Sequence, residues 1–167
     1  MKQTSVPIHL QIIGDIDFAS FAKFDQELRE LEEAGQKVVG VLLSSQGGSP
    51  EASLAFASRM RLSPCDIHIV VMGCVYSAAI IILAYGDKRF MTRESWAMVH
   101  EEKMKINDRV TSMERQVAVL RKFEDQAADL LFERTGTDAD TWKELHEREA
   151  YLTPEACKQL NLIEEIL

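Results

Sequence analysis

Two short apolar runs, each preceded and followed by a segment with helical character, constrain this chain more than any other feature. Residues 38–43 and 67–72 are almost entirely aliphatic and rich in β-branched side chains. Runs of this kind are typical of strands that are covered on both faces, as in parallel sheets. Parallel neighbours also need long crossovers between them, usually helices. The sequence therefore predicts an α/β chain built on a largely parallel sheet.

Periodicity and helix-end signals predict the remaining elements. Asp17 and Ser49 can act as N-caps, and Pro50 fits the first helical position because its missing N–H costs nothing there. Gly73 is expected to end the strand that precedes it. The predicted strands are residues 7–13, 38–43, 67–72, 89–91, 96–99, 151–152 and 162–163, and the predicted helices are residues 18–34, 50–61, 77–86, 108–134, 138–145 and 154–160.

The helix predicted over residues 108–134 is longer than a compact domain of this size needs. Apolar side chains recur along it at helical spacing, and Gly136 follows its end. At a rise of 1.5 Å per residue it is about 40 Å long. We therefore expect part of it to project from the domain or to contact another subunit.

Composition indicates one domain over residues 1–167 and argues against several functions. Of the 167 residues 46% are hydrophobic, and the net charge is -8, which disfavours a nucleic-acid partner. The apolar stretches at 67–72 and 78–85 are too short to span a membrane, and the N-terminus is unlike a signal peptide. Three widely spaced cysteines form neither a disulfide framework nor a zinc motif. We expect a cytoplasmic protein.

Three sequence features together point to acyl transfer. Gly47-Gly48 follows one predicted strand, Ser77 stands between a strand and a helix, and His100 ends a later strand. Taken singly, these are commonly a turn, a helix cap and a core residue. Together they supply a nucleophile, a base, and backbone N–H donors at Gly48 and Ala78 for the oxyanion of a reacting carbonyl.

These residues and their order resemble the ClpP-type serine peptidases. The resemblance covers nearly the whole chain from about residue 7. The matching segments are Gln46-Gly47-Gly48-Ser49, Gly73 with Ser77, Lys88-Arg89-Phe90, Met98-Val99-His100, Thr135-Gly136 and the tail at 151–167. The resemblance implies an α/β, ClpP/crotonase-like fold of repeated strand–strand–helix units with a projecting long helix.

The resemblance also assigns roles to individual residues. Ser77 becomes the nucleophile and His100 the general base, and Gly48 and Ala78 the oxyanion donors. The family's triad aspartate lies two residues before an aromatic residue, which is Tyr151 here, so its position is occupied by Glu149. Glutamate can orient a histidine in some triads, and Glu147 and Asp140 are the alternatives.

Three positions depart from the family's pattern. Tyr76 and Ala79 stand where the family has small residues or glycine, and Tyr76 either narrows the substrate pocket or packs beneath the helix. After His100 the family has a proline and a glycine-rich stretch to which an extended substrate adds as a strand. This chain has the charged segment 101–105 there.

For assembly, the resemblance implies a homo-oligomeric ring, commonly of seven subunits. Two such rings would stack through the long helix and the strand before it. The segment that helps related proteins engage a hexameric AAA+ ATPase precedes their first strand, and this sequence begins almost at that strand. We therefore do not expect an ATPase partner.

The function expected from these features is that of a serine endopeptidase acting on peptides or unfolded segments inside a ring, without a metal or organic cofactor. One alternative is a catalytically weak, ring-forming ClpP-like structural paralogue. A less favoured alternative is a crotonase-type acyl-CoA enzyme, which shares the fold and the oxyanion geometry.

Overall fold

The computed structural model describes residues 6–101 and 109–167. Its elements, in chain order, are β1 (Leu10–Ile16), α1 (Phe18–Glu33), β2 (Val38–Gly48), α2 (Pro50–Arg61), β3 (Asp66–Tyr76), α3 (Ala79–Ala84), β4 (Lys88–Met91), β5 (Trp96–Met98), α4 (Val110–Thr135), α5 (Ala139–Glu147), β6 (Tyr151–Leu152), α6 (Pro154–Gln159) and β7 (Glu165–Ile166).

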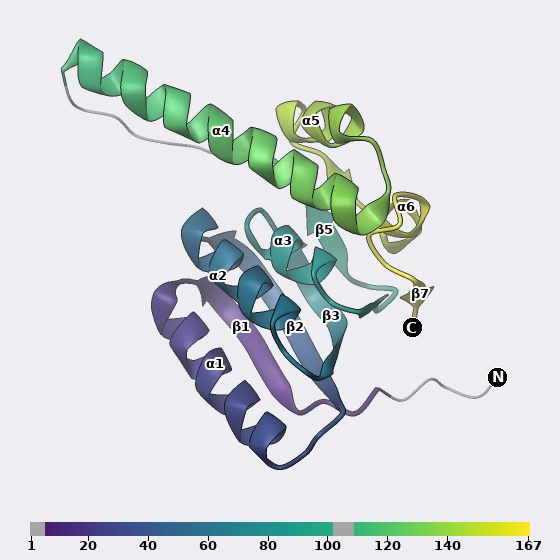
Figure 1. Cartoon of the computed structure of the whole chain (residues 1–167). Helices are drawn as coiled ribbons and strands as arrows, with labels where there is room; N and C mark the ends of the chain where they lie inside the picture. Colours follow the sequence, from purple (N-terminus) through teal and green to yellow (C-terminus); the bar gives the residue numbers. More distant parts are fainter. Residues whose placement is uncertain (1–5, 102–108) are drawn as a thin grey trace.

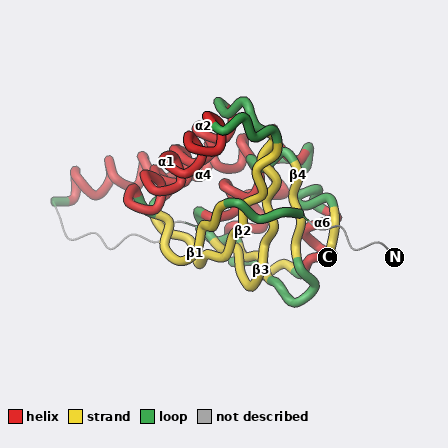
Figure 2. The backbone as a smooth tube through the Cα atoms, turned by 90° about the horizontal axis from the view of Figure 1, so that it is seen from below, coloured by secondary structure: helices red, strands yellow, loops and turns green. Residues whose placement is uncertain are grey.

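The seven strands form a sheet in the order β1-β2-β3-β4-β7, with β5 paired to the far end of β3 and β6 paired to β5. Every pairing is parallel except that of β5 with β6. The helices α1, α2 and α4 gather on one side of this sheet (Figures 1 and 2). The predicted α/β architecture with a largely parallel sheet is confirmed.

The capping predictions at the starts of α1 and α2 are confirmed. The Asp17 carboxylate accepts a hydrogen bond from the backbone N–H of Ser20 at 2.7 Å, and the Ser20 hydroxyl oxygen accepts one from the backbone N–H of Asp17. Ser49 accepts the N–H of Ala52, and Pro50 occupies the first turn. These bonds satisfy N–H groups that have no partner inside the helix.

The core lies between the sheet and the helices on that side. Phe24 of α1 packs against Phe56 of α2 with ring centroids 5.0 Å apart, and both are buried. All six residues of α3 are buried as well. Burying each large side chain stabilises the fold by about 1.5–3 kcal/mol. α3, which follows Ser77, is therefore among the most firmly held elements.

The opposite face of the sheet is covered only in part, and the prediction of two covered faces is wrong for the single chain. Val38 and Leu42 of β2 are half-buried, whereas Val39 and Leu43 are fully buried. On the neighbouring strands Ile13 and Met72 have 59% and 43% of their surface exposed. In isolation the chain leaves apolar surface on this face.

Most strand boundaries differ from the prediction: β1 covers Leu10–Ile16 instead of 7–13, and β2 continues to Gly48 instead of ending at residue 43. β3 runs through Gly73 to Tyr76 instead of ending at Gly73, because the glycine adopts φ +93° where the strand changes its partner from β4 to β5. A glycine inside a strand often marks such a bulge. The last strand is Glu165–Ile166 and not 162–163, since Leu162 and Ile163 pack into the core instead.

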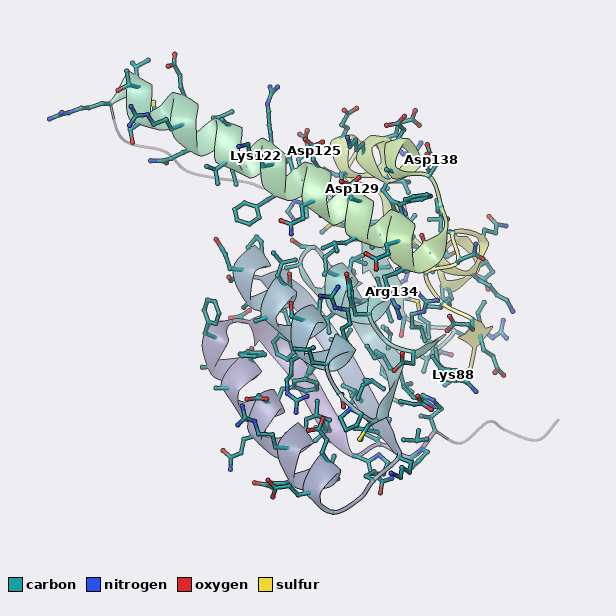
Figure 3. All side chains as sticks on the ribbon, viewed as in Figure 1. Lys88, Lys122, Asp125, Asp129, Arg134 and Asp138 are labelled. Atoms are coloured by element: carbon teal, nitrogen blue, oxygen red, sulfur yellow. The ribbon has the colours of Figure 1, made fainter. Side chains whose placement is uncertain are left out.

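The long helix is confirmed as α4, and it projects from the body of the molecule (Figure 1). Its buried residues, Ala128, Leu131 and Thr135, all lie toward its C-terminal end, where Arg134 is labelled in Figure 3. The Arg134 guanidinium donates to the carbonyl of Ala84, the last residue of α3, and to that of Gly86 just after it. The projecting part keeps apolar residues at its surface, such as Val110, which is 70% exposed.

An ion network joins α1 to α2. Arg59 donates to Asp25 at 2.6 Å and to Glu32 at 2.7 Å, and all three side chains are less than one fifth exposed. Hydrogen bonds from Arg29 and Arg59 hold the pKa of Asp25 below its ordinary value, and Arg59 does the same for Glu32. The network thus stabilises the packing of the two helices with both carboxylates ionised.

We predict that Arg59→Met lowers the free energy of unfolding by about 2 kcal/mol, because two largely buried carboxylates lose their shared cation. Urea unfolding at fixed protein concentration measures this. Because the folded-state pKa values are lowered, the difference from wild type is present above the ordinary carboxyl pKa of about 4 and shrinks as pH falls through the folded values.

Arg29→Met is the matched control. It removes a bond to the same Asp25, but the Arg29 side chain is 65% exposed and the pair is screened by water. We expect a loss of about 0.5 kcal/mol. Equal losses in the two variants, or a difference that persists unchanged at acid pH, would contradict this account.

Candidate active site

Ser77 lies in the turn between β3 and α3 with φ +54°, a conformation that serine rarely adopts. Its N–H donates to the carbonyl of Met98 in β5 at 2.8 Å, and its carbonyl accepts the N–H of Ile80 at the start of α3. The turn is therefore fixed on both sides, by a neighbouring strand and by a buried helix. Strained backbone held in this way is typical of functional positions.

Gly47 packs directly against this turn. A Cβ atom added to Gly47 would come within 2.7 Å of the Ser77 Cβ and 2.9 Å of the Tyr76 carbonyl oxygen, and its φ is +105°. Its N–H donates to the Ser45 hydroxyl at 3.0 Å. Only glycine fits here, so the first residue of the predicted pair brings the end of β2 beside the serine.

Both predicted oxyanion donors lie at this junction. Gly48 follows Gly47 at the end of β2, and Ala78 follows Ser77 at the start of α3. The Ala78 N–H has no hydrogen-bond acceptor within residues 6–101 and 109–167. A backbone donor without an internal partner beside a hydroxyl can stabilise negative charge on a bound carbonyl oxygen.

Ser77 and His100 line the same cavity, which has a volume of about 50 Å³. Its walls come from α2, α3, α4 and α5 and are mostly apolar, with Leu54, Ile80 and Leu131 among them. The structure therefore brings the two predicted residues to one side of the sheet, although they lie on different segments. A mostly apolar cavity with a few polar groups is typical of ligand sites.

The ring of His100 is oriented by its own chain. Its Nδ1 atom hydrogen-bonds the carbonyl oxygen of Glu101. A carbonyl can only accept, so Nδ1 carries the proton and Nε2 keeps a lone pair. This tautomer is the one that a general base needs.

Glu149 follows α5 and stands two residues before β6, the strand that pairs with β5. The antiparallel pairing of β5 with β6 matches Met98 to Tyr151, and the Val99 N–H donates to the Ala150 carbonyl at 3.0 Å. The pairing stops there, because Glu149 lies in a turn whose N–H donates to the His146 carbonyl at 3.1 Å, and His100 lies two residues beyond the end of β5. Glu149 is exposed and has φ +49°.

The two alternative acids have other surroundings. Glu147, at the end of α5, lines a second cavity together with Glu101. Asp140 lies in the first turn of α5, at the opposite end of that helix. Within residues 6–101 and 109–167, left-handed backbone at residues other than glycine occurs at Ser77, Glu149 and Asn161. Two of these three positions are predicted site residues.

Sequence reasoning missed two ionisable residues of the cavity, Glu124 of α4 and His146 of α5. The His146 Nδ1 atom lies 2.6 Å from the Trp142 carbonyl oxygen, and burial lowers the pKa of its imidazole. Spacing offered a signal, because His146 is four residues after Trp142 and so shares its buried face of α5. For Glu124, only the packing of α4 over α3 reveals its place.

Tyr76 packs beneath the serine turn and does not line the cavity. Its ring meets that of Tyr151 edge to face, with centroids 5.9 Å apart. Burial raises the pKa of the Tyr76 hydroxyl. Of the two interpretations of this residue, the packing role fits the structure.

Ala79 is fully buried in α3, while residues 102–105 of the charged segment lie outside the described residues.

Within residues 6–101 and 109–167, no group of three or more His, Cys, Asp or Glu side chains is arranged to hold a metal ion. In the same residues, no helix has the length and apolar character needed to cross a membrane.

The chain is similar to known proteolytic subunits. It is 24% identical over 157 residues to the ATP-dependent Clp protease proteolytic subunit 1 of Rhodopirellula baltica, covering 92% of this chain and 69% of that protein. It is 26% identical over 137 residues to the ATP-dependent Clp protease proteolytic subunit of Bdellovibrio bacteriovorus, covering 79% of this chain and 65% of that protein.

The fold and the sequence pattern lead to the same assignment. A solved structure of a ClpP1 mutant from Listeria monocytogenes superposes with a TM-score of 0.87 at 21% identity, covering 95% of this chain and 91% of that one. This likeness confirms the predicted ClpP-like fold. The family model described as Clp protease matches residues 7–167, and the chain therefore belongs to the Clp protease family.

Proposed function

We propose that this protein is a serine endopeptidase of the ClpP type, which hydrolyses peptides or unfolded segments inside a homo-oligomeric ring in the cytoplasm. The observation that carries the proposal is the shared cavity of Ser77 and His100, beside a strained turn whose next N–H has no internal acceptor among the described residues. Membership of the Clp protease family supports it.

In the proposed reaction, Ser77 Oγ attacks the scissile carbonyl while His100 Nε2 takes its proton. The N–H groups of Ala78 and Gly48 donate to the oxyanion that forms. His100 then gives the proton to the leaving amine, and an acyl-enzyme remains on Ser77. Water attacks this ester by the same route in reverse, which releases the acid and restores the serine.

Glu149 is the third member of the proposed triad. Its carboxylate would stabilise the His100 imidazolium that forms during the reaction. The place of Glu149 just before the strand that pairs with β5 supports this role, and a negative charge beside His100 would favour the protonated ring. The His100 Nδ1–H would exchange its hydrogen bond to the Glu101 carbonyl for one to this carboxylate when the site tightens around substrate. Such tightening is common, since catalytic hydrogen bonds are often incomplete in the free protein.

Assembly into a ring fits the surfaces that the single chain leaves exposed. Apolar side chains remain on the open sheet face, such as Ile13 and Met72, and on the projecting part of α4, such as Val110. Contacts between subunits would bury them. Short peptides need no ATPase for entry, and they are therefore the substrates on which the proposal is tested.

A catalytically weak, ring-forming paralogue is the second candidate, because the presumed acid position holds an exposed glutamate. A serine-directed fluorophosphonate separates the two. We predict that wild type is labelled, that Ser77→Ala abolishes the labelling and peptide hydrolysis, and that His100→Ala lowers both by about 10³-fold or more. Mass spectrometry of the labelled peptide locates the adduct. An assembled wild type that resists labelling would favour the paralogue.

For the triad acid, we predict that Glu149→Gln lowers kcat for a fluorogenic peptide by about 10²- to 10⁴-fold and changes KM little, because the lost charge acts on the transition state. Glu147→Gln and Asp140→Asn are the controls, with kcat within about twofold of wild type. If the largest fall in kcat occurred in one of the two controls, the residue changed in that control would be the one that orients His100.

For the glycine beside the nucleophile, we predict that Gly47→Ala abolishes fluorophosphonate labelling of Ser77. The added Cβ atom meets the serine turn at 2.7 Å on backbone with φ +105°, so the turn has to move. Gly35→Ala is the control, since its φ is +76° but its Cβ would meet nothing within 4 Å. It should cost only stability, about 1 kcal/mol in urea unfolding. Normal labelling of Gly47→Ala would disprove the packing argument.

A further inference from the structure

The cavity beside Ser77 has a polar wall that the proposed reaction does not use. Glu124 and His146 line this cavity, and both also line the second cavity, whose volume is about 350 Å³. They therefore separate a narrow, mostly apolar space next to the nucleophile from a larger, charged one. A side chain that fills the first space would meet these two residues at the wall that the two cavities share.

Position decides which part of a substrate enters this cavity. When the scissile carbonyl lies on Ser77 Oγ with its oxygen at the Ala78 N–H, the side chain on the acyl side of that carbonyl is two bonds away. Ser77 and Ala78 both line the cavity. The cavity is therefore the specificity pocket for the residue whose carbonyl is attacked, as in other serine peptidases.

The small volume and the walls of the pocket favour a slender apolar stem. Leu54, Ile80, Ile81 and Leu131 provide aliphatic contacts. With a volume of about 50 Å³ the pocket suits an unbranched chain of methylenes better than an aromatic ring. Lysine and arginine carry such a stem and keep their charged group at its far end.

The polar groups of the shared wall, those of Glu124 and His146, are hydrogen-bond acceptors. The Nδ1 proton of His146 is used by the Trp142 carbonyl, which leaves Nε2 with a lone pair. Burial lowers the pKa of the imidazole, so it is neutral at neutral pH. The Glu124 carboxylate has several acceptor positions and can receive a further bond whatever its other contacts.

The net charge behind this wall is negative. The second cavity is lined by the carboxylates of Glu101, Glu124, Asp125 and Glu147 and by the cations of Arg121 and Lys143. Lys143 is paired to Asp125 at 2.8 Å. This arrangement attracts a positive group and repels a negative one.

We infer that this pocket selects a substrate residue with an unbranched aliphatic stem and a cationic end, such as lysine, on the acyl side of the scissile bond, with Glu124 and His146 receiving the cation. This specificity rests on the proposed peptidase function. The ammonium would donate to the carboxylate and to the imidazole Nε2, while its methylenes lie against the aliphatic walls.

The test compares two peptidyl fluorophosphonates that differ only at this residue, one with a lysine side chain and one with norleucine. Norleucine has the same straight stem without the ammonium group. We expect the assembled wild type to react about tenfold faster with the lysine probe, since a hydrogen bond to a charged group is worth about one such factor. Glu124→Gln and His146→Leu should each bring the ratio toward one.

Asp129→Asn is the matched control. It removes one negative charge from the same helix, at a residue that lines neither cavity and is labelled in Figure 3. Its lysine-to-norleucine ratio should equal that of wild type. A fall as large as in Glu124→Gln would mean that general charge and not the pocket wall sets the preference, which would overturn the inference.

The remaining outcomes separate the inference from the function. Equal or faster reaction of the norleucine probe in wild type overturns the lysine preference while leaving the peptidase intact. A protein that no fluorophosphonate labels fails as a peptidase. In that case a binding experiment still tests the pocket. Acetylated tripeptides that end in lysine or in norleucine are titrated into the Ser77→Ala variant, and the NMR signals of the His146 ring report their binding. Tighter binding of the norleucine peptide overturns it.

Discussion

The contact between Gly47 and the turn at Ser77 is the constraint on which the rest of the site depends. It requires the end of β2, the end of β3 and the start of α3 to come so close together that no Cβ atom fits at Gly47. The bond from the Ser77 N–H to Met98 adds β5 to this junction. A hydroxyl, two backbone amides and the strand that precedes His100 are therefore placed by one set of parallel strands.

Keeping Ser77 at φ +54° has a cost, since left-handed backbone outside glycine is unfavourable by about 1–2 kcal/mol. The adjacent helix offsets it. All six residues of α3 are buried, and the guanidinium of Arg134 bonds the carbonyls at and just after the end of the helix. The strained turn therefore lies between two firmly packed elements, and relaxing it would require disturbing the core.

Much of this arrangement can be read from local sequence. The caps at Asp17 and Ser49, the glycine pair and the strand–serine–helix succession depend on neighbours within a few residues, and the structure contains them all. The outcome was different where tertiary partners decide. Gly73 continues its strand because β5 is available to pair beyond it. The apolar pair Leu162 and Ile163 enters the core instead of the sheet.

The cavity shows most clearly why sequence reasoning was incomplete. Ser77 and His100 were found because each ends an element with a recognisable pattern. Glu124 lies mid-helix among other charged residues, and nothing local separates it from a solvated side chain. Its place depends on α4 crossing α3, which is fixed by the Arg134 bonds to the carbonyls at and just after the end of α3.

The two sides of the cavity differ in how freely their residues can be replaced. Ser77 and Ala78, the proposed nucleophile and one of the proposed oxyanion donors, lie in a turn held by backbone contacts with Gly47 and Met98, so most substitutions there disrupt the turn. The far wall of the cavity is made by side chains of α4 and α5, whose backbones do not depend on them. Glu124 and His146 could be replaced with little effect on the fold. If the proposed function and specificity hold, substrate preference can therefore vary at this wall while the chemistry at Ser77 stays the same.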